Sequence, residues 1–192
     1  MDINSCSLGQ GLVYEDMLPL NWRKLEARHT PLELAHLQEN NEEVLRVIGV
    51  IDEYLSESGE EHAPLSQETL RVETKLNLLI TLVGQLITLH YPQPPTKPVK
   101  LSACDIEWVA DDVARVGDYG IVELYLSPRC QRPLVFPGTV VKMDELAGGH
   151  CIGMNFGELG DLIQERLEKI IFRHHRRSIA LARRRASNDP LS

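Results

Sequence analysis

The chain has 192 residues, of which 43% are hydrophobic and 25% are charged, which is typical of a folded protein and excludes general disorder. A chain of this length can bury one good core and an attachment, but hardly two large domains. The formal net charge of −8 argues against a protein that coats nucleic acid over most of its surface, although residues 173–185 hold six arginines and no carboxylate.

The first predicted elements are an extended segment at residues 8–29, which turns at Pro19 and would supply a strand, and a helix that follows it. Thr30, Pro31 and Glu33 form a capping box, with threonine as N-cap, proline at the first helical position and glutamate three residues after the cap. Apolar positions then recur in steps of three and four, which predicts a coiled-coil seam with one polar position. The members of this outer helix seam are Leu34, Leu37, Asn41, Val44, Ile48, Ile51 and Leu55.

A second helix is predicted over residues 64–90. The positions expected to form an oligomer interface are Leu65, Thr69, Val72, Leu76, Leu79, Ile80, Val83, Leu86 and Ile87. No charged residue occurs between Lys75 and His90, so this helix is apolar nearly all round and must be covered nearly all round. The first helix would cover one side, and either the rest of the same chain or other copies would cover the remainder.

Self-association is the favoured cover for the second helix. A helix of about 25 residues extends roughly 37 Å, well beyond the width of a small barrel, so most of its length cannot reach the rest of the chain. We therefore expect residues 30–91 to form an inserted helical hairpin for oligomerisation. The expected assembly is a homotetramer held by a parallel coiled coil, with the second helix inside and the first helix outside.

The remainder of the chain is predicted to be mainly strands. Four prolines in residues 91–98 predict a stiff linker at residues 92–98. From residue 100 the hydrophobic period changes to two, with glycine and proline turns, and a final helix runs from about residue 161 to 185. The expected fold class is α+β: a small antiparallel β-barrel built from residues 1–29 and 99–192, which includes a C-terminal helix, with the two long helices inserted between two strands.

The cysteines and the apolar segments bear on the cellular compartment. The four cysteines lack the spacing of a zinc motif, so no metal is expected. The sequence does not begin with a basic start and an apolar run, and its longest apolar window, residues 76–89, is shorter than the roughly 20 residues of a membrane span. These features predict a cytoplasmic protein with reduced thiols and no membrane span.

The order of several short segments resembles that of a PilZ domain. These segments are the strand start Leu101-Ser102, the turn Gly117-Asp118, and the stretches VELYL, GTVVKM and CIGMNFGEL. The resemblance implies a six-stranded barrel closed by a C-terminal helix and a role in signalling by the bacterial messenger cyclic di-GMP. The inserted helices resemble an atypical branch of this family that forms tetramers through a four-stranded coiled coil.

The resemblance also points to candidate ligand-binding residues. PilZ proteins that bind the messenger carry an R-x-x-x-R pair before the first strand, whose guanidinium groups pair with phosphates and stack on guanine, and a [D/N]-x-S-x-x-G motif in the next strand. Ser102 matches the second motif, whereas Lys100 replaces its Asp or Asn and Asp105 replaces its glycine. The arginine pair is missing near the start, but its spacing recurs at Arg173 and Arg177 on the last helix. The ligand-binding candidates are Lys100, Ser102, Arg173, Arg176 and Arg177.

These features together predict a regulator and not an enzyme, because no catalytic constellation and no nucleotide-binding loop occurs in the sequence. We expect an oligomeric PilZ-type regulator that binds a partner protein, has weak or no affinity for cyclic di-GMP and uses no other cofactor. One alternative is a direct cyclic di-GMP receptor that uses the basic residues of the last helix. Another is a nucleic-acid-binding protein that uses the arginine-rich tail, against which the net charge argues. A solvated helix end whose cations complement the helix dipole also accounts for that tail.

Overall fold

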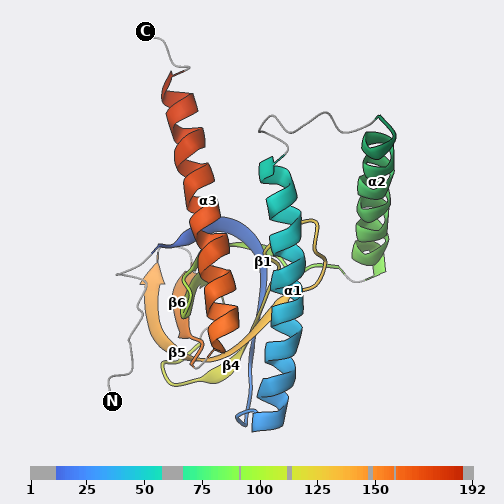
Figure 1. The fold of residues 1–192 in the computed structure, drawn as a ribbon. Coiled ribbons are helices and arrows are strands. Elements are labelled where there is room, and N and C mark those ends of the chain that lie inside the picture. Colours follow the sequence, from blue (N-terminus) through green and yellow to red (C-terminus); the bar gives the residue numbers. More distant parts are fainter. Residues whose placement is uncertain are drawn as a thin grey trace.

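The computed structural model describes residues 12–57, 67–90, 92–111, 114–146, 149–157 and 159–187. Within these ranges six strands form a closed antiparallel barrel in the order β1-β2-β3-β6-β5-β4, accompanied by three helices (Figure 1). The elements are β1 (Tyr14–Lys24), α1 (Pro31–Glu57), α2 (Gln67–His90), β2 (Thr96–Leu101), β3 (Asp105–Ala110), β4 (Tyr119–Leu124), β5 (Leu134–Leu146), β6 (Gly149–Asn155) and α3 (Asp161–Ser187). The predicted fold class is confirmed, including the insertion of two helices between the first two strands.

The barrel closes because β1 is long enough to pair with two strands. Its first half pairs with β2, from Tyr14 opposite Leu101, and its second half pairs with β4, from Leu20 opposite Leu124. Alternating residues of the strands point inward and form the core, in which the rings of Phe136 and Phe156 stack with their centroids 4.3 Å apart. This core accounts for the period of two in the second half of the sequence.

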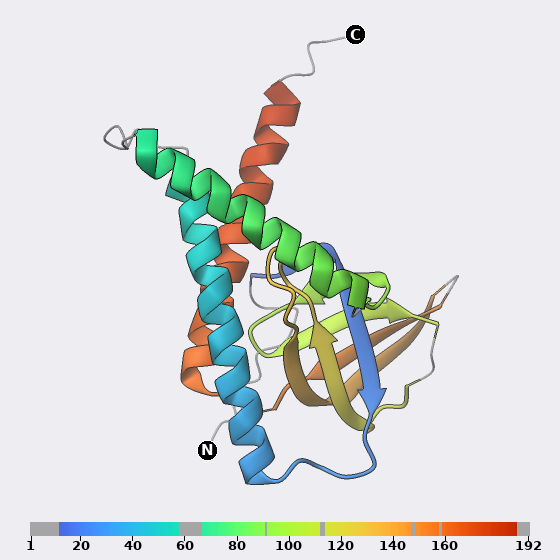
Figure 2. The same ribbon diagram turned by 90° about the vertical axis from the view of Figure 1, so that its right-hand side faces the viewer.

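The first inserted helix, α1, begins where the sequence predicts. Thr30 Oγ1 accepts the N–H of Glu33 at 3.3 Å, and the Glu33 carboxylate accepts the N–H of Thr30 at 2.7 Å, so the capping box is confirmed. Beyond the cap, α1 packs against β5 of the barrel and runs alongside α3 in the same direction (Figures 1 and 2).

The seam of α1 corrects the expectation of a helical hairpin. Val44 and Ile48 of the seam are buried, together with their neighbour Leu45, in the same core cluster as the barrel and α3. The barrel and α3 therefore cover the middle of the predicted stripe, which does not face α2, whereas the side chain of Leu55 lies outside the described part of the chain. The reason is the direction of α1, which returns along the outside of the barrel and can bury its stripe there without a second helix.

Asn41 occupies the polar position of this seam, and its partner is in the barrel. Its side chain is only 1% exposed, its Nδ2 donates to the carbonyl of Val135 at 2.8 Å, and its Oδ1 accepts the N–H of Val135 at 2.8 Å. The polar position of the seam is therefore bonded to the barrel of the same chain. It satisfies both backbone groups of one residue of β5 at the point where α1 crosses this strand.

The second inserted helix, α2, stands apart from α1 and from most of the barrel (Figure 1). Its predicted interface positions from Thr69 to Ile87 are exposed, with Leu79 at 57%, whereas Leu65 lies outside the described residues. The single chain therefore covers α2 neither with the barrel nor with α1. None of the helices in the described ranges is both long and apolar enough to cross a membrane.

The predicted linker at residues 92–98 is shorter in the structure. Strand β2 begins at Thr96, which lies opposite Pro19, and Pro98 lies opposite Met17 of β1. A proline fits in a strand where the ladder does not need its missing N–H, so several prolines in eight residues do not exclude pairing. The barrel portion after the insertion therefore starts at residue 96, three residues before the predicted boundary.

The C-terminal helix, α3, has two different halves. Ile163, Leu167 and Ile170 in its first half are buried against α1 and β1. Its second half projects beyond the barrel (Figure 1), and Ile179 in this half is exposed. The basic residues predicted as ligand-binding candidates begin where the packed half ends.

Candidate functional site

The turn between β2 and β3 holds the one residue that matches the messenger-binding motif. The Ser102 hydroxyl donates to Oδ1 of Asp105 at 2.6 Å and accepts the amide N–H groups of Cys104 at 3.1 Å and Asp105 at 3.0 Å. Ser102 is 3% exposed and Asp105 is also buried. A hydroxyl has one donor and two acceptor positions, so these bonds use the whole capacity of Ser102 within the turn.

Lys100 lies on the outer face of the barrel, away from Ser102. Its Nζ is 3.3 Å from Oε1 of Glu15 on β1, and it borders a cavity of about 360 Å³ that the carboxylates of Asp16 and Glu107 also line. Burial, and then the charge of Glu107, raises the pKa of the Cys151 thiol in the same cavity, which keeps this thiol protonated. Carboxylates outnumber the cation here, so the surroundings of Lys100 do not favour an anion.

The three arginine candidates of α3 are distributed over different surroundings. Arg173 lines a cavity between α1 and α3 together with Arg166 and Lys169. Arg176 lies over the ring of Phe172, with its guanidinium carbon 5.9 Å from the ring centroid. Arg177 lines a different cavity, next to β1. The five predicted ligand-binding residues therefore do not form one site, although the structure places Arg177 near the start of β1.

The cavity at Arg177 contains residues that the sequence analysis missed. His174 stacks on Tyr14 with ring centroids 3.7 Å apart, and its Nε2 lies 3.7 Å from a carboxylate oxygen of Asp16. Arg129, from the loop between β4 and β5, lines the same cavity. The R-x-x-x-R spacing on α3 was a signal for Arg177, but the sequence holds no signal that brings Arg129 or Tyr14 to it.

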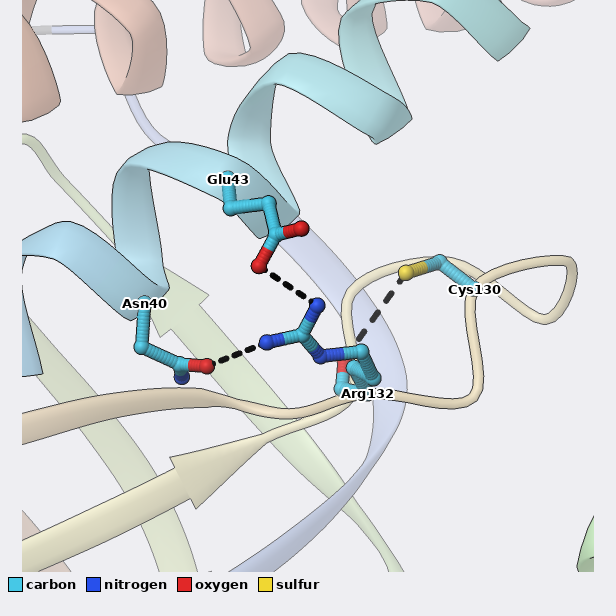
Figure 3. Close-up of polar contacts among 4 residues, drawn as sticks. All are labelled: Asn40, Glu43, Cys130 and Arg132. Atoms are coloured by element: carbon cyan, nitrogen blue, oxygen red, sulfur yellow. Dashed lines mark hydrogen bonds and ion pairs between the residues drawn. The ribbon is translucent and has the colours of Figure 1, made fainter.

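A set of polar contacts fixes the loop that carries Arg129. Arg132 Nη1 donates to the Glu43 carboxylate at 2.7 Å, and its Nη2 donates to the side-chain oxygen of Asn40; both acceptors are on α1 (Figure 3). The Cys130 thiol lies 4.0 Å from the carbonyl oxygen of Arg132. The bond from Arg132 lowers the pKa of Glu43, which favours the charged pair. The loop is thus tied to α1, next to the cavity.

The other functional feature is the surface of α2. The exposed aliphatic side chains of this helix are Val72, Leu76, Leu78, Leu79, Ile80, Leu82, Val83, Leu86, Ile87 and Leu89. Monomeric proteins rarely expose so large a continuous apolar surface, and such surfaces mark interaction sites.

Comparison with solved structures supports this fold over most of the chain. One similar solved structure is that of a pathogenic protein from Xanthomonas campestris, described as a new tetrameric PilZ domain that self-assembles through an unusual helical bundle. The two sequences are 25% identical, and the alignment covers 90% of this chain and 92% of that chain with a TM-score of 0.73. The structure of the Bacillus subtilis inhibitor of motility is 17% identical over 42% of this chain and 41% of that chain, with a TM-score of 0.36. A search of curated proteins gives no match.

The family itself follows from a comparison with family models. The model described as atypical PilZ domain, cyclic di-GMP receptor, matches residues 45–184, which is well over half of the chain. The match extends from the middle of α1 to the second half of α3 and includes β2 to β6. The chain belongs to the atypical PilZ domain family of cyclic di-GMP receptors.

Proposed function

We propose that the chain is a non-enzymatic, cytoplasmic regulator in cyclic di-GMP signalling that acts by binding partner proteins and has little affinity of its own for the messenger. The observation that supports this proposal most directly is the hydrogen bond from the Ser102 hydroxyl to the Asp105 carboxylate in the β2–β3 turn. A carboxylate at the position where messenger-binding members have glycine repels a dianionic ligand, and the serine hydroxyl is already engaged. A cytoplasmic location agrees with the free thiols of Cys130 and Cys151.

The missing arginine pair sets the expected affinity. Hydrogen bonds to charged groups contribute about 1.5–3 kcal/mol each, and each 1.4 kcal/mol is about a factor of ten in the dissociation constant. The loss of two such bonds weakens binding by roughly two to four powers of ten. We therefore expect a dissociation constant for cyclic di-GMP above roughly 10 μM.

Calorimetric titration with cyclic di-GMP at fixed salt tests this proposal. The comparison is between the wild type, Asp105→Gly, and the double variant Arg173→Ala with Arg177→Ala, with the melting temperature of each variant measured as a check of folding. We expect weak or no heat from the wild type. Submicromolar binding by the wild type that is lost in the double variant would instead establish a direct receptor that uses α3.

We further propose that the chain forms a tetramer whose central bundle is built by α2. The support is the exposed aliphatic surface of α2 together with the similarity to the Xanthomonas campestris protein, which is a tetramer. Because α1 packs on the barrel, the bundle core consists of α2 helices, which we expect to run parallel. Sedimentation equilibrium should give four times the 21.7 kDa of one chain, and a monomer at micromolar concentration would refute the assembly.

A further inference from the structure

The outer face of the barrel carries a row of four apolar side chains on four neighbouring strands. Met17 of β1 lies opposite Pro98 of β2. Val109 of β3 lies opposite Cys151 of β6, and the register between β2 and β3 places Pro98 beside Val109. All four residues line the cavity of about 360 Å³ that Lys100 borders. We call these four side chains the apolar row.

The apolar row is accessible in the part of the chain that the structure describes. The main contacts of the helices with the barrel are those of α1 with β5 and of α3 with β1. Met17 is 55% exposed, Pro98 is also exposed, and Val109 and Cys151 are half-buried. Neighbouring strands are about 4.8 Å apart, so the row extends over roughly 14 Å. Two to three turns of an α-helix have this length.

Carboxylates outnumber lysines around the apolar row. The charged groups that border it are two lysines and four carboxylates: Lys100, Lys142, Glu15, Asp16, Glu107 and Asp144. Lys142 Nζ lies 3.1 Å from Asp144 and 3.2 Å from Glu107, and the hydrogen bonds to these two carboxylates raise the pKa of Lys142. The carboxylates remain in excess even if His174, which lies beside Asp16, carries a charge. Ion pairs between exposed side chains are weak in water, so these carboxylates can exchange partners with cations of another molecule.

We propose that the apolar row and its border of carboxylates form the docking surface for a basic amphipathic helix of a partner protein. The inference rests on the proposed adaptor role and names the part of the barrel that performs it. One helical turn advances about 5.4 Å, which is close to the strand spacing of about 4.8 Å. Apolar side chains one turn apart on the partner can therefore each meet one strand of the row. Lysine or arginine side chains on the flank of that helix then lie near Glu15 and Glu107, which gives charge complementarity.

Protection of the Cys151 thiol by a synthetic helix tests the proposal on the full chain. The probe is an amphipathic helix of leucine and lysine, about 14 residues long. The readout is the rate at which N-ethylmaleimide alkylates Cys151, measured by mass spectrometry of proteolytic fragments. Cys104, in the β2–β3 turn, is also half-buried but does not line the cavity, so it is the internal control.

The expected result is protection of Cys151 without protection of Cys104. Half-protection of Cys151 should occur at a peptide concentration on the order of 100 μM. A helix of leucine and glutamate of the same length should need a concentration at least about tenfold higher, because the carboxylates around the row repel it.

Met17→Lys and Val141→Lys are matched variants of the barrel. Met17 and Val141 are apolar strand residues that are 55% and 54% exposed, but Val141 does not line the cavity. Met17→Lys should raise the concentration for half-protection about tenfold or more, because it removes an apolar contact and adds a repelling charge. Val141→Lys should leave that concentration unchanged, and the melting temperature of each variant checks its folding. An equal loss in both variants would show that overall charge, and not the row, governs binding.

Three further results would overturn the docking surface. They are an unprotected Cys151 at about 1 mM peptide, equal protection by the two helices, and equal protection of Cys104. Protection of Cys151 that rises with protein concentration in the absence of peptide would instead assign the row to a second copy of the chain. The adaptor proposal is tested separately, because it fails only if cyclic di-GMP binds at submicromolar concentration. Weak messenger binding together with an unprotected Cys151 would refute this surface and leave the adaptor role with another one.

Discussion

Asn41 shows at the scale of one residue how a polar group specifies the position of α1. Its amide satisfies both the N–H and the carbonyl of Val135, and the side chain is almost fully buried. Asn41→Leu would leave these two backbone groups without their partner, at a cost of about 1–3 kcal/mol for each group that stays unsatisfied. We expect the variant to be less stable by about 2–6 kcal/mol, measured as a lower melting temperature at fixed protein concentration.

The neighbouring Asn40 provides the matched control. Asn40→Leu is the same chemical change, but Asn40 accepts from the exposed Arg132 at the protein surface. Its cost should be below about 1 kcal/mol, which is typical of surface substitutions. If Asn41→Leu is instead more stable than the wild type, Asn41 serves register in an assembly and not the attachment of α1 to β5.

At the scale of one element, the proposed tetramer makes the exposed aliphatic surface of α2 the main source of assembly energy. Full burial of one aliphatic side chain contributes about 1.5–3 kcal/mol, so even four of them would contribute roughly 6–12 kcal/mol per chain. Leu79→Asp and Leu86→Asp would place carboxylates in the bundle core, where each buried charge costs several kcal/mol in every copy. We expect the double variant to sediment as a lower-order species.

The control for these variants is on α1. Val50→Asp introduces the same charge at an exposed aliphatic position of the helix that packs on the barrel. This variant should keep the mass of the wild type. An unchanged mass for the Leu79 and Leu86 double variant would show that α2 does not hold the subunits together.

At the scale of the whole molecule, several carboxylates link stability to pH. Hydrogen bonds from Thr30, Arg132 and Lys24 lower the pKa values of Glu33, Glu43 and Asp118 in the folded protein. A lowered pKa in the folded state contributes stability that is complete above the ordinary value of about 4 and is lost as the pH falls through the folded value. The melting temperature should therefore decline at pH values below about 4.

The size of this decline should depend on salt, because Glu33 and Glu43 are exposed, as is Lys24, the partner of Asp118, and salt screens such pairs. Glu43→Gln removes one of the groups and should make the decline with falling pH shallower than in the wild type. A decline of equal slope in Glu43→Gln would show that the pair of Glu43 and Arg132 does not contribute to acid sensitivity.

Local patterns along the chain were enough to predict the elements and their order. The capping box fixed the start of α1, the strand period and turn residues indicated the barrel, and the uncharged stretch between Lys75 and His90 identified a helix that needs a partner. These features are readable because backbone capping and hydrophobic periodicity act between residues that are close along the chain.

The pairing of one surface with another, by contrast, depends on the tertiary fold. The seam of α1 has the spacing of a coiled coil, yet the helix packs on β5 and α3. Hydrophobic periodicity predicts that a helix has an apolar face, but it does not predict which surface covers that face. Ser102 matches a ligand motif, but its bond to Asp105 depends on side-chain orientation within the turn. Arg129 and Arg177 share a cavity because barrel closure and the docking of α3 bring distant segments together, which no local pattern in the sequence records.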